Sequence, residues 1–242
     1  MSLWQNCSNN ILQDLQENDV ETCNIIMKTI KNINNVEKIN LQFNDSDIIF
    51  LKTLLPIKLI FLNHNLYYSI HGITHTARVM LYSLIISKML NIDYKLPVFI
   101  ASLHDTQRQN DREDLNHSKR ASLYFLNNIK TKYQEYIDKK DIISFVISNH
   151  NITNIDLMNE KNFEKIFYLN LLKTADALDR FRLPKEKWWP NQNMIPFKFF
   201  NSMLDRFKLF TCTTEIDFIS NNRKLDFIDI VSDNIDVLIS NI

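Results

Sequence analysis

Hydrophobic residues recur at helical spacing along most of the chain and are separated by short polar breaks. In the first 45 residues, an apolar face predicts two short helices, divided by the Asn-rich stretch 32–35. A third helix is predicted over residues 46–62, with Ser46 as its N-cap and an interruption at Pro56. These segments carry no cluster of chemically active side chains, so we expect them to cover a core.

The same periodicity continues through the rest of the chain. An apolar stripe runs from Ala77 to Met89, and a second apolar run opens with Pro97 and closes on His104-Asp105. Pro suits the first turn of a helix, where its missing N–H needs no partner, so this run predicts a buried helix. Further helices are predicted over residues 117–129, 141–150, 163–182, 199–210 and 225–239, with an irregular loop at residues 183–196.

The composition favours an all-α protein. The chain has one Gly and five Pro in 242 residues, whereas sandwiches, barrels and nucleotide-cradling folds need Gly at turns and phosphate loops. With 45% hydrophobic residues and no recognisable repeat or linker, we expect one helical domain over residues 1–242. The three cysteines form no CxxC pair, which favours buried thiols of a reducing compartment over ligands or disulfides.

The charge balance argues against several kinds of partner. Lys+Arg and Asp+Glu both total 28, so no global basic field draws the chain to nucleic acid or to an anionic membrane. No stretch reaches the roughly 18 apolar residues of a membrane span, and the N-terminus lacks the pattern of a signal peptide. We therefore expect a cytoplasmic protein with a small-molecule partner, and the sequence leaves a homo-oligomer open.

The dipeptide His104-Asp105 is the first candidate for chemistry. Neutral imidazole and carboxylate are ordinary ligands of Zn, Fe, Mn and Mg. Both side chains close an apolar helix, and neither is cheaply buried without a partner. The dipeptide therefore predicts a metal site, provided that other segments supply further ligands.

A cluster of histidines precedes this dipeptide, because three of the six histidines fall within residues 64–75. His71, His75 and Arg78 have the spacing that places side chains on one face of a helix. Of these, His75 is the predicted ligand, His71 is left open between a ligand and a structural histidine, and His64 is interpreted as structural or exposed. The only Gly of the chain, Gly72, lies in this segment, which suggests that the backbone passes close to something there.

Three later residues occupy similar positions in predicted helices. His117 begins a helix after a polar loop, and His150 closes the short apolar helix 141–150. Asp176 is flanked by small apolar residues, where an unpaired carboxylate would be costly to bury, so it needs a metal ion or a donor. Asp179, one turn later, is interpreted as structural or as a supporting residue, with an arginine as its partner.

Together these residues predict a centre for two metal ions. The predicted ligands are His75, His104, Asp105, His117, His150 and Asp176. They fill two adjacent sites if Asp105 bridges them, which also makes Asp105 a catalytic residue. Such ions lower the pKa of a bound water toward neutrality, give a hydroxide nucleophile and stabilise charge on phosphoryl oxygens. The predicted cationic contacts to the phosphate are Arg78, Arg108 and Lys173.

The ordered set of motifs resembles the HD-domain superfamily of metal-dependent phosphohydrolases, and its small bacterial members in particular. The motifs are His71-Gly72-x-x-His75-x-x-Arg78-Val79, Leu103-His104-Asp105-x-x-Arg108, Arg108-x-Asn110-Asp111-x-x-Asp114-x-x-His117 and Ala175-Asp176-Ala177-Leu178-Asp179-Arg180. They fall within residues 71–182, in an HD-like core predicted at about residues 63–182. The chain departs from the family at Gln107, where members usually have Gly.

The resemblance implies a helical bundle with extra N- and C-terminal helices. It also implies that His75, His104, Asp105 and Asp176 bind a first ion, and that additional histidines hold a second one. The residues that match this second role are His117 and His150. One or two divalent ions are expected, with Mn, Fe, Mg, Co and Zn as the candidates.

The function that we expect is hydrolysis of a phosphate ester or anhydride, with a nucleotide or a nucleotide second messenger as substrate. Two alternatives stay open at this point. The same six ligands could serve a di-iron oxygenase, as in a minority of HD-like proteins. The chain could also be a non-catalytic domain that binds a nucleotide or a partner protein through its Trp188-Trp189 loop.

Overall fold

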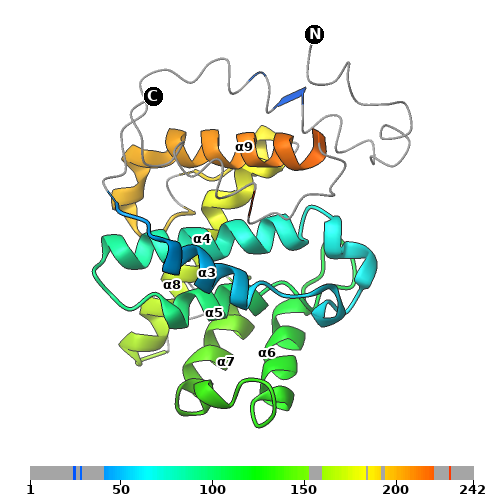
Figure 1. Ribbon diagram of the computed structural model, residues 1–242, viewed down its shortest axis with the longest axis vertical. Helices are drawn as coiled ribbons and strands as arrows, with labels where there is room; N and C mark the ends of the chain where they lie inside the picture. Colours follow the sequence, from blue (N-terminus) through cyan, green and yellow to red (C-terminus); the bar gives the residue numbers. More distant parts are fainter. Residues whose placement is uncertain are drawn as a thin grey trace. The chain divides into compact units, whose positions relative to one another are not determined.

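A computed structural model describes residues 24–25, 28, 41–152, 160–183, 185–191, 194–220 and 229. The fold of these residues is all-α, because they form helices and loops and contain no strand (Figure 1). This confirms the fold class that the composition predicts. The helices predicted in the first 40 residues and at residues 225–239 lie almost entirely outside the described residues. Among the described residues, no helix is long and apolar enough to cross a membrane.

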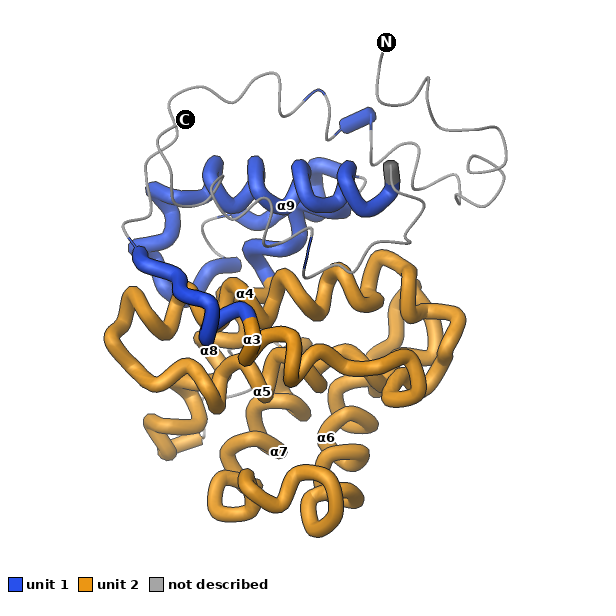
Figure 2. The backbone as a smooth tube through the Cα atoms, viewed as in Figure 1, with its two compact units in different colours: residues 1–48, 177–242 blue, residues 49–176 orange. Residues whose placement is uncertain are grey.

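The chain divides into two compact units (Figure 2). Unit 1 comprises residues 1–48 and 177–242, and unit 2 comprises residues 49–176. Each unit is described in turn, and the single domain that the sequence predicts stays a prediction.

Unit 2 contains the helices that carry the predicted ligands. Its α-helices are α3 (Asp45–Leu54, from its fifth residue on), α4 (Ile73–Met89), α5 (Lys95–Leu103), α6 (His117–Asn128), α7 (Lys140–Asn149) and α8 (Phe163–Leu178, up to Asp176). Its 3-10 helices are η2 (Lys58–Ile60), η3 (His64–Tyr68) and η4 (Gln134–Lys139). Helices α4 and α5 pack side by side, as do α6 and α7 (Figure 1).

Helix α4 is the centre of the core of unit 2. Every residue from Ile73 to Ser87 is buried, so this helix has no solvent-facing side over most of its length. A helix that is buried on all sides is a central core element, and the polar residues that α4 buries, such as His75 and Arg78, need partners inside the protein. Helix α5 is also buried from Pro97 to Leu103, which confirms the predicted buried helix that opens with Pro97 and leads to His104.

The chain enters α4 through a tight approach at Gly72, as its single Gly suggested. A Cβ atom at this position would lie 2.6 Å from the carbonyl carbon of Tyr67 and closer still to the carbonyl oxygens of Tyr67 and Leu66. All three atoms belong to the backbone, so they cannot swing aside as a flexible side chain would. Only Gly therefore lets the η3 turn pack directly against the start of α4.

Two local predictions need correction. Asn44, not Ser46, caps α3, because its side-chain oxygen accepts a hydrogen bond from the amide of Asp47 at 3.1 Å, and the Asp47 carboxylate accepts from the Asn44 amide at 2.9 Å. His71 does not lie on α4 with His75 and Arg78, because the helix begins only at Ile73.

Unit 1 contains α9 (Leu204–Ser220) and three 3-10 helices, η6 (Asp179–Arg182), η7 (Glu186–Trp188) and η8 (Lys198–Met203). Its aromatic core includes Phe200, Phe207 and Phe210, which are fully buried. The loop predicted as irregular at residues 183–196 holds only the single turn of η7 among its described residues.

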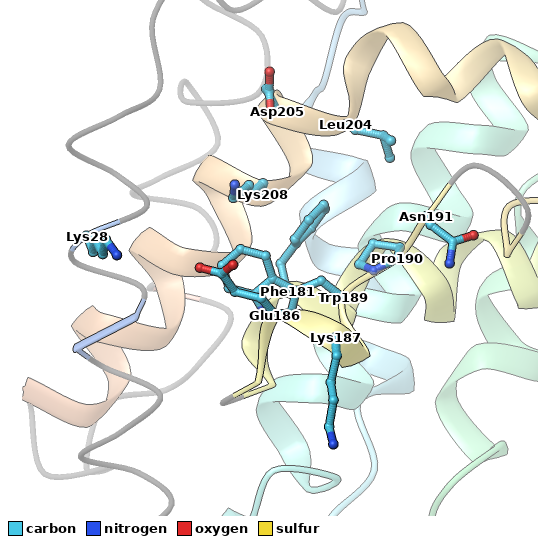
Figure 3. A pocket seen from close by; sticks show the side chains of 10 residues that line it. All are labelled: Lys28, Phe181, Glu186, Lys187, Trp189, Pro190, Asn191, Leu204, Asp205 and Lys208. Atoms are coloured by element: carbon cyan, nitrogen blue, oxygen red, sulfur yellow. The ribbon is translucent and has the colours of Figure 1, made fainter.

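The two tryptophans of this loop differ in their surroundings. Trp189 and Phe181 lie in the wall of a pocket of about 600 Å³, and the Lys208 ammonium lies 4.8 Å from the centre of the Trp189 ring (Figure 3). Trp188 is 39% exposed, and the ammonium groups of Lys185 and Lys187 lie 5.1 and 5.9 Å from the centre of its ring. Trp188 is therefore not a core residue, and lysines cover the face of its ring.

Candidate metal centre

The six side chains predicted as metal ligands come together in unit 2 at the ends of five helices. They are His75 in the first turn of α4, His104 and Asp105 directly after α5, His117 at the start of α6, His150 directly after α7 and Asp176 in the last turn of α8. All are buried except Asp176, whose side chain is 31% exposed. The geometry therefore agrees with the convergence expected from the sequence, and binding of an ion stays a prediction.

A first group of donor atoms surrounds the Nε2 atom of His75. It lies 3.1 Å from Nε2 of His104, 3.5 Å from Oδ2 of Asp105 and 3.5 Å from Oδ1 of Asp176. His75, His104 and Asp176 can each point one ligand atom at a common position. This group thus combines two imidazoles with two carboxylates.

A second group surrounds the other carboxylate oxygen of Asp105. Its Oδ1 atom lies 3.0 Å from Nε2 of His117 and 3.4 Å from Nε2 of His150. These two Nε2 atoms are themselves 3.0 Å apart. Asp105 therefore gives one oxygen to each group, which is the bridging position that the sequence predicts for it.

The donor separations match those around a bound divalent ion. Ligand atoms about 2.1 Å from an ion lie about 3.0 Å apart at right angles and about 3.4 Å apart at tetrahedral angles. The separations in the two groups run from 3.0 to 3.5 Å. Both groups thus have the dimensions of a coordination sphere.

Backbone hydrogen bonds fix three of the imidazole rings in one orientation. The Nδ1 atom of His104 donates to the carbonyl of Ala101 at 2.7 Å, and that of His150 donates to the carbonyl of Ile147 at 2.8 Å. His117 makes the same bond to the carbonyl of Asp114. In each case the acceptor lies three residues earlier. Because the proton sits on Nδ1, the neutral ring presents its lone pair on Nε2, which is the atom aimed at the other ligands.

This arrangement calls for a cation. The Nε2 atoms of His117 and His150 face each other at 3.0 Å, and both carry a lone pair when the rings are neutral. Two facing lone pairs repel in a buried site, and a metal ion or a proton between them removes the repulsion. The donor set of imidazoles and carboxylates is one that Zn, Fe, Mn and Co bind. The residues present therefore fit the expected ions.

The protonation states of the ion-free centre follow from burial and from Asp105. Burial lowers the pKa of His104 to about 3, so this ring is neutral at pH 7. Burial disfavours the charged form of Asp105, but the electrostatic interactions with His104 and Arg108 and the hydrogen bonds with His117 and His150 hold its pKa well below the ordinary value. The pKa of His117 is raised, because the hydrogen bond and charge of Asp105 outweigh the burial of the ring. Without an ion, a proton on His117 can therefore take part of the role of the cation.

The predicted phosphate contacts differ in their position. Arg108 lies in the centre, with one terminal nitrogen 3.4 Å from each carboxylate oxygen of Asp105. Lys173 lies one turn before Asp176 on α8, and its ammonium donates to the carbonyl of Ile152 at 2.6 Å. Arg78 is fully buried on α4, one turn after His75. Contact of Arg78 with a substrate stays a prediction that would require the substrate to reach the interior.

His71, which the sequence left open as a ligand, forms a hydrogen bond with Asp111 near the centre. His71 donates from Nδ1 to Oδ1 of Asp111 at 3.1 Å, and Ser69 donates to the same oxygen at 2.9 Å. The His71 ring lies edge-on to that of His75. Because 40 residues separate His71 from Asp111, no local pattern indicates this pair, and the only signal in the sequence is that Asp111 lies in one of the motifs that resemble the HD-domain superfamily.

Three other predicted residues have clear surroundings. His64 is exposed in η3, as interpreted. Asp179 is buried in unit 1 and forms an ion pair with Arg182 at 3.1 Å, which is the structural role proposed for it. Gln107 needs no Gly conformation, because among the described residues other than Gly only Asn91 has a positive φ. Its side chain instead donates to the carbonyl of Ile60 at 2.7 Å and ties the loop after Asp105 to η2.

Comparison of the chain with protein-family models, with curated proteins and with solved structures finds no match, so membership of the HD-domain superfamily stays an expectation based on the motifs.

Proposed function

We propose that this chain is a metal-dependent phosphohydrolase that acts on a phosphate ester or anhydride, with a nucleotide or a nucleotide second messenger as substrate. The observation that carries the proposal is the pair of donor groups joined by Asp105. Their Nε2 and carboxylate oxygen atoms lie 3.0 to 3.5 Å apart. Three backbone carbonyls hold rings of these groups in the orientation that an ion requires.

The roles of the side chains follow from this grouping. His75, His104 and Asp176 would hold a first ion, His117 and His150 a second, and Asp105 both, one through each oxygen. When bound, divalent ions lower the pKa of a coordinated water toward neutrality and stabilise negative charge on phosphoryl oxygens. Burial keeps the His104 ring neutral near pH 7, whereas His117, whose pKa is raised beside Asp105, would release its proton when an ion binds.

A phosphorylated substrate fits the charges around the centre. The side chain of Asp176 is 31% exposed, which marks the side on which solvent reaches the ligands. Lys173 lies one turn away on the same helix, and Arg108 lies against Asp105. In this proposal, these two cations would contact phosphoryl oxygens of the substrate. The cytoplasm stays the expected compartment.

Hydrolysis assays with added metal ions test the proposal. The ion-free protein is supplied with Mn²⁺, Mg²⁺, Co²⁺, Fe²⁺ or Zn²⁺ and offered p-nitrophenyl phosphate, bis(p-nitrophenyl) phosphate and nucleoside mono-, di- and triphosphates. We expect release of phosphate or of a nucleoside phosphate with at least one ion. Asp105→Asn keeps the shape of the side chain but removes the bridging charge, so its rate should fall by at least about a hundredfold.

The control variant is His64→Gln, which changes an exposed histidine outside the centre and should leave the rate unchanged. The proposal is wrong if no ion supports turnover of any of these substrates, or if Asp105→Asn and His64→Gln have equal activity.

A further inference from the structure

The guanidinium of Arg108 lies inside the second donor group. Its NH1 atom is 3.4 Å from Nε2 of His117 and 3.4 Å from Oδ1 of Asp105, two of the three atoms that would hold the second ion. The side chain is only 10% exposed. Its NH2 atom donates to the carbonyl of Arg112 at 3.0 Å, so the guanidinium is fixed in this position from two sides.

The two groups therefore differ in their charge. Nε2 of His75 in the first group has carboxylate oxygens of both Asp105 and Asp176 within 3.5 Å. The second group has only Asp105 as its carboxylate ligand, and the guanidinium offsets that charge, because its NH1 atom lies 3.4 Å from both oxygens of Asp105 and 3.4 Å from Nε2 of His117. A divalent ion is attracted by the first group and has to compete with a cation in the second.

We propose that Arg108 acts as a resident cation in the second site, and that it yields this site to an ion when an anionic substrate draws the guanidinium away. The inference rests on the proposed metal centre and adds to it an order of binding. The first ion binds in the absence of substrate. The second ion binds weakly until a phosphate group accepts the hydrogen bonds of Arg108.

The proposal predicts a measurable coupling between the binding of phosphate and the binding of the second ion. If phosphate strengthens binding of the second ion by some factor, the second ion strengthens binding of phosphate by the same factor. A guanidinium binds two phosphate oxygens in a bidentate manner, which gives it a good alternative to Asp105. Both ions would then be bound tightly only when the phosphorylated substrate is present. Without substrate, the second ion would be bound weakly.

The test is a titration of the ion-free full chain with Mn²⁺, with free Mn²⁺ measured by electron paramagnetic resonance, in the presence and absence of inorganic phosphate. The wild type should bind one ion tightly and a second at least about tenfold more weakly, and phosphate should strengthen the second by about tenfold. In Arg108→Gln, the second ion should bind about tenfold more tightly without phosphate, and the effect of phosphate should shrink.

Arg112→Gln is the matched control, because it removes an exposed arginine of the same loop and should behave as the wild type. Thermal unfolding of both variants establishes that they are folded. The effect of phosphate on the affinity for the second ion is measured in the wild type, so this part of the test does not depend on any variant. The role of Arg108 is overturned if the wild type binds two Mn²⁺ ions with equally high affinity. It is also overturned if Arg108→Gln and Arg112→Gln bind the second ion with equal affinity. Neither outcome contradicts the proposed hydrolase. Absence of any bound Mn²⁺ in all three proteins would overturn the proposed order of binding, whereas the hydrolase is overturned by the lack of turnover with every ion.

Discussion

At the scale of single residues, the centre depends on one repeated device. His104, His117 and His150 each donate an Nδ1 proton to a backbone carbonyl three residues earlier. His104 and His150 directly follow a helix, so the last turn supplies the acceptor without any other side chain. The device fixes the ring and its tautomer together, and it leaves Nε2 as the atom available to an ion.

Burial of His104 makes the stability of the ion-free protein depend on pH. The pKa of this ring is about 3 in the folded chain and 6.5 in an ordinary environment, so between these values the unfolded chain binds a proton that the folded chain does not. The free energy of unfolding should therefore fall as the pH is lowered from about 6 to about 4.5, by up to about 1.4 kcal/mol per pH unit. Urea unfolding at several pH values measures the slope.

The neighbouring groups do not disturb this window. The raised pKa of His117 contributes stability that is fully present below pH 6.5 and lost only as the pH rises through the folded value. The lowered pKa of Asp105 contributes stability that is lost only as the pH falls from 3.8 downward. His104→Gln should flatten the slope, whereas His64→Gln should keep it, and equal slopes in the two variants would exclude His104 as the cause.

The sequence indicated most of these residues but not their partners. The sequence indicated that His104 and His150 each close an apolar helix, because the helical periodicity of apolar residues stops at these positions. The position of Arg108 between Asp105 and His117 was not visible, since it depends on how the loop 109–116 folds back. The pairing of His71 with Asp111 was hidden for the same reason, because local patterns do not report contacts across 40 residues.

At the scale of secondary structure, periodicity located the helices of unit 2 but placed the start of α4 too early. Helix α7 (Lys140–Asn149) nearly coincides with the prediction, because the chain around it is strongly periodic. The start of α4 was placed too early, since His71 and His75 have the spacing of helix neighbours although Gly72 separates them. The helix cannot begin before Ile73, because η3 packs against Gly72. This is a tertiary contact that the sequence indicates only through its single Gly.

Gly72→Ala tests this junction. The new Cβ would meet backbone atoms of Tyr67 and Leu66, so either η3 or the first turn of α4 has to move. We expect a loss of about 1–3 kcal/mol in the free energy of unfolding, together with weaker Mn²⁺ binding because His75 lies in the displaced turn. Urea unfolding and a Mn²⁺ titration measure the two effects.

Asn65→Ala is a suitable comparison, because Asn65 is an exposed residue of the same η3 turn. Its effect should stay within about 0.5 kcal/mol. If Gly72→Ala is as stable as Asn65→Ala, the close approach at Gly72 does not constrain the chain.

At the scale of the whole molecule, the centre joins the ends of five helices of unit 2. The ligands come from positions between residue 75 and residue 176, so each bound ion bridges segments that are distant in the sequence. Such a site cannot exist in the unfolded chain, and its binding free energy is therefore added to the stability of the folded state. The composition indicated the all-α class, but the division into units 1 and 2 depends on contacts that no local pattern displays.

Ion binding should accordingly raise the unfolding temperature. At a free Mn²⁺ concentration one hundred times the dissociation constant, binding adds about 2.7 kcal/mol, or about 5–10 °C for a chain of this size. Asp105→Asn should lose most of this shift, because one oxygen of Asp105 faces each donor group. Asp141→Asn, which alters an exposed carboxylate in the first turn of α7, should keep it. Calorimetric scans with Mn²⁺ and with a chelator distinguish the two cases. An equal shift in both variants would mean that the ion stabilises the chain from somewhere other than the centre around Asp105.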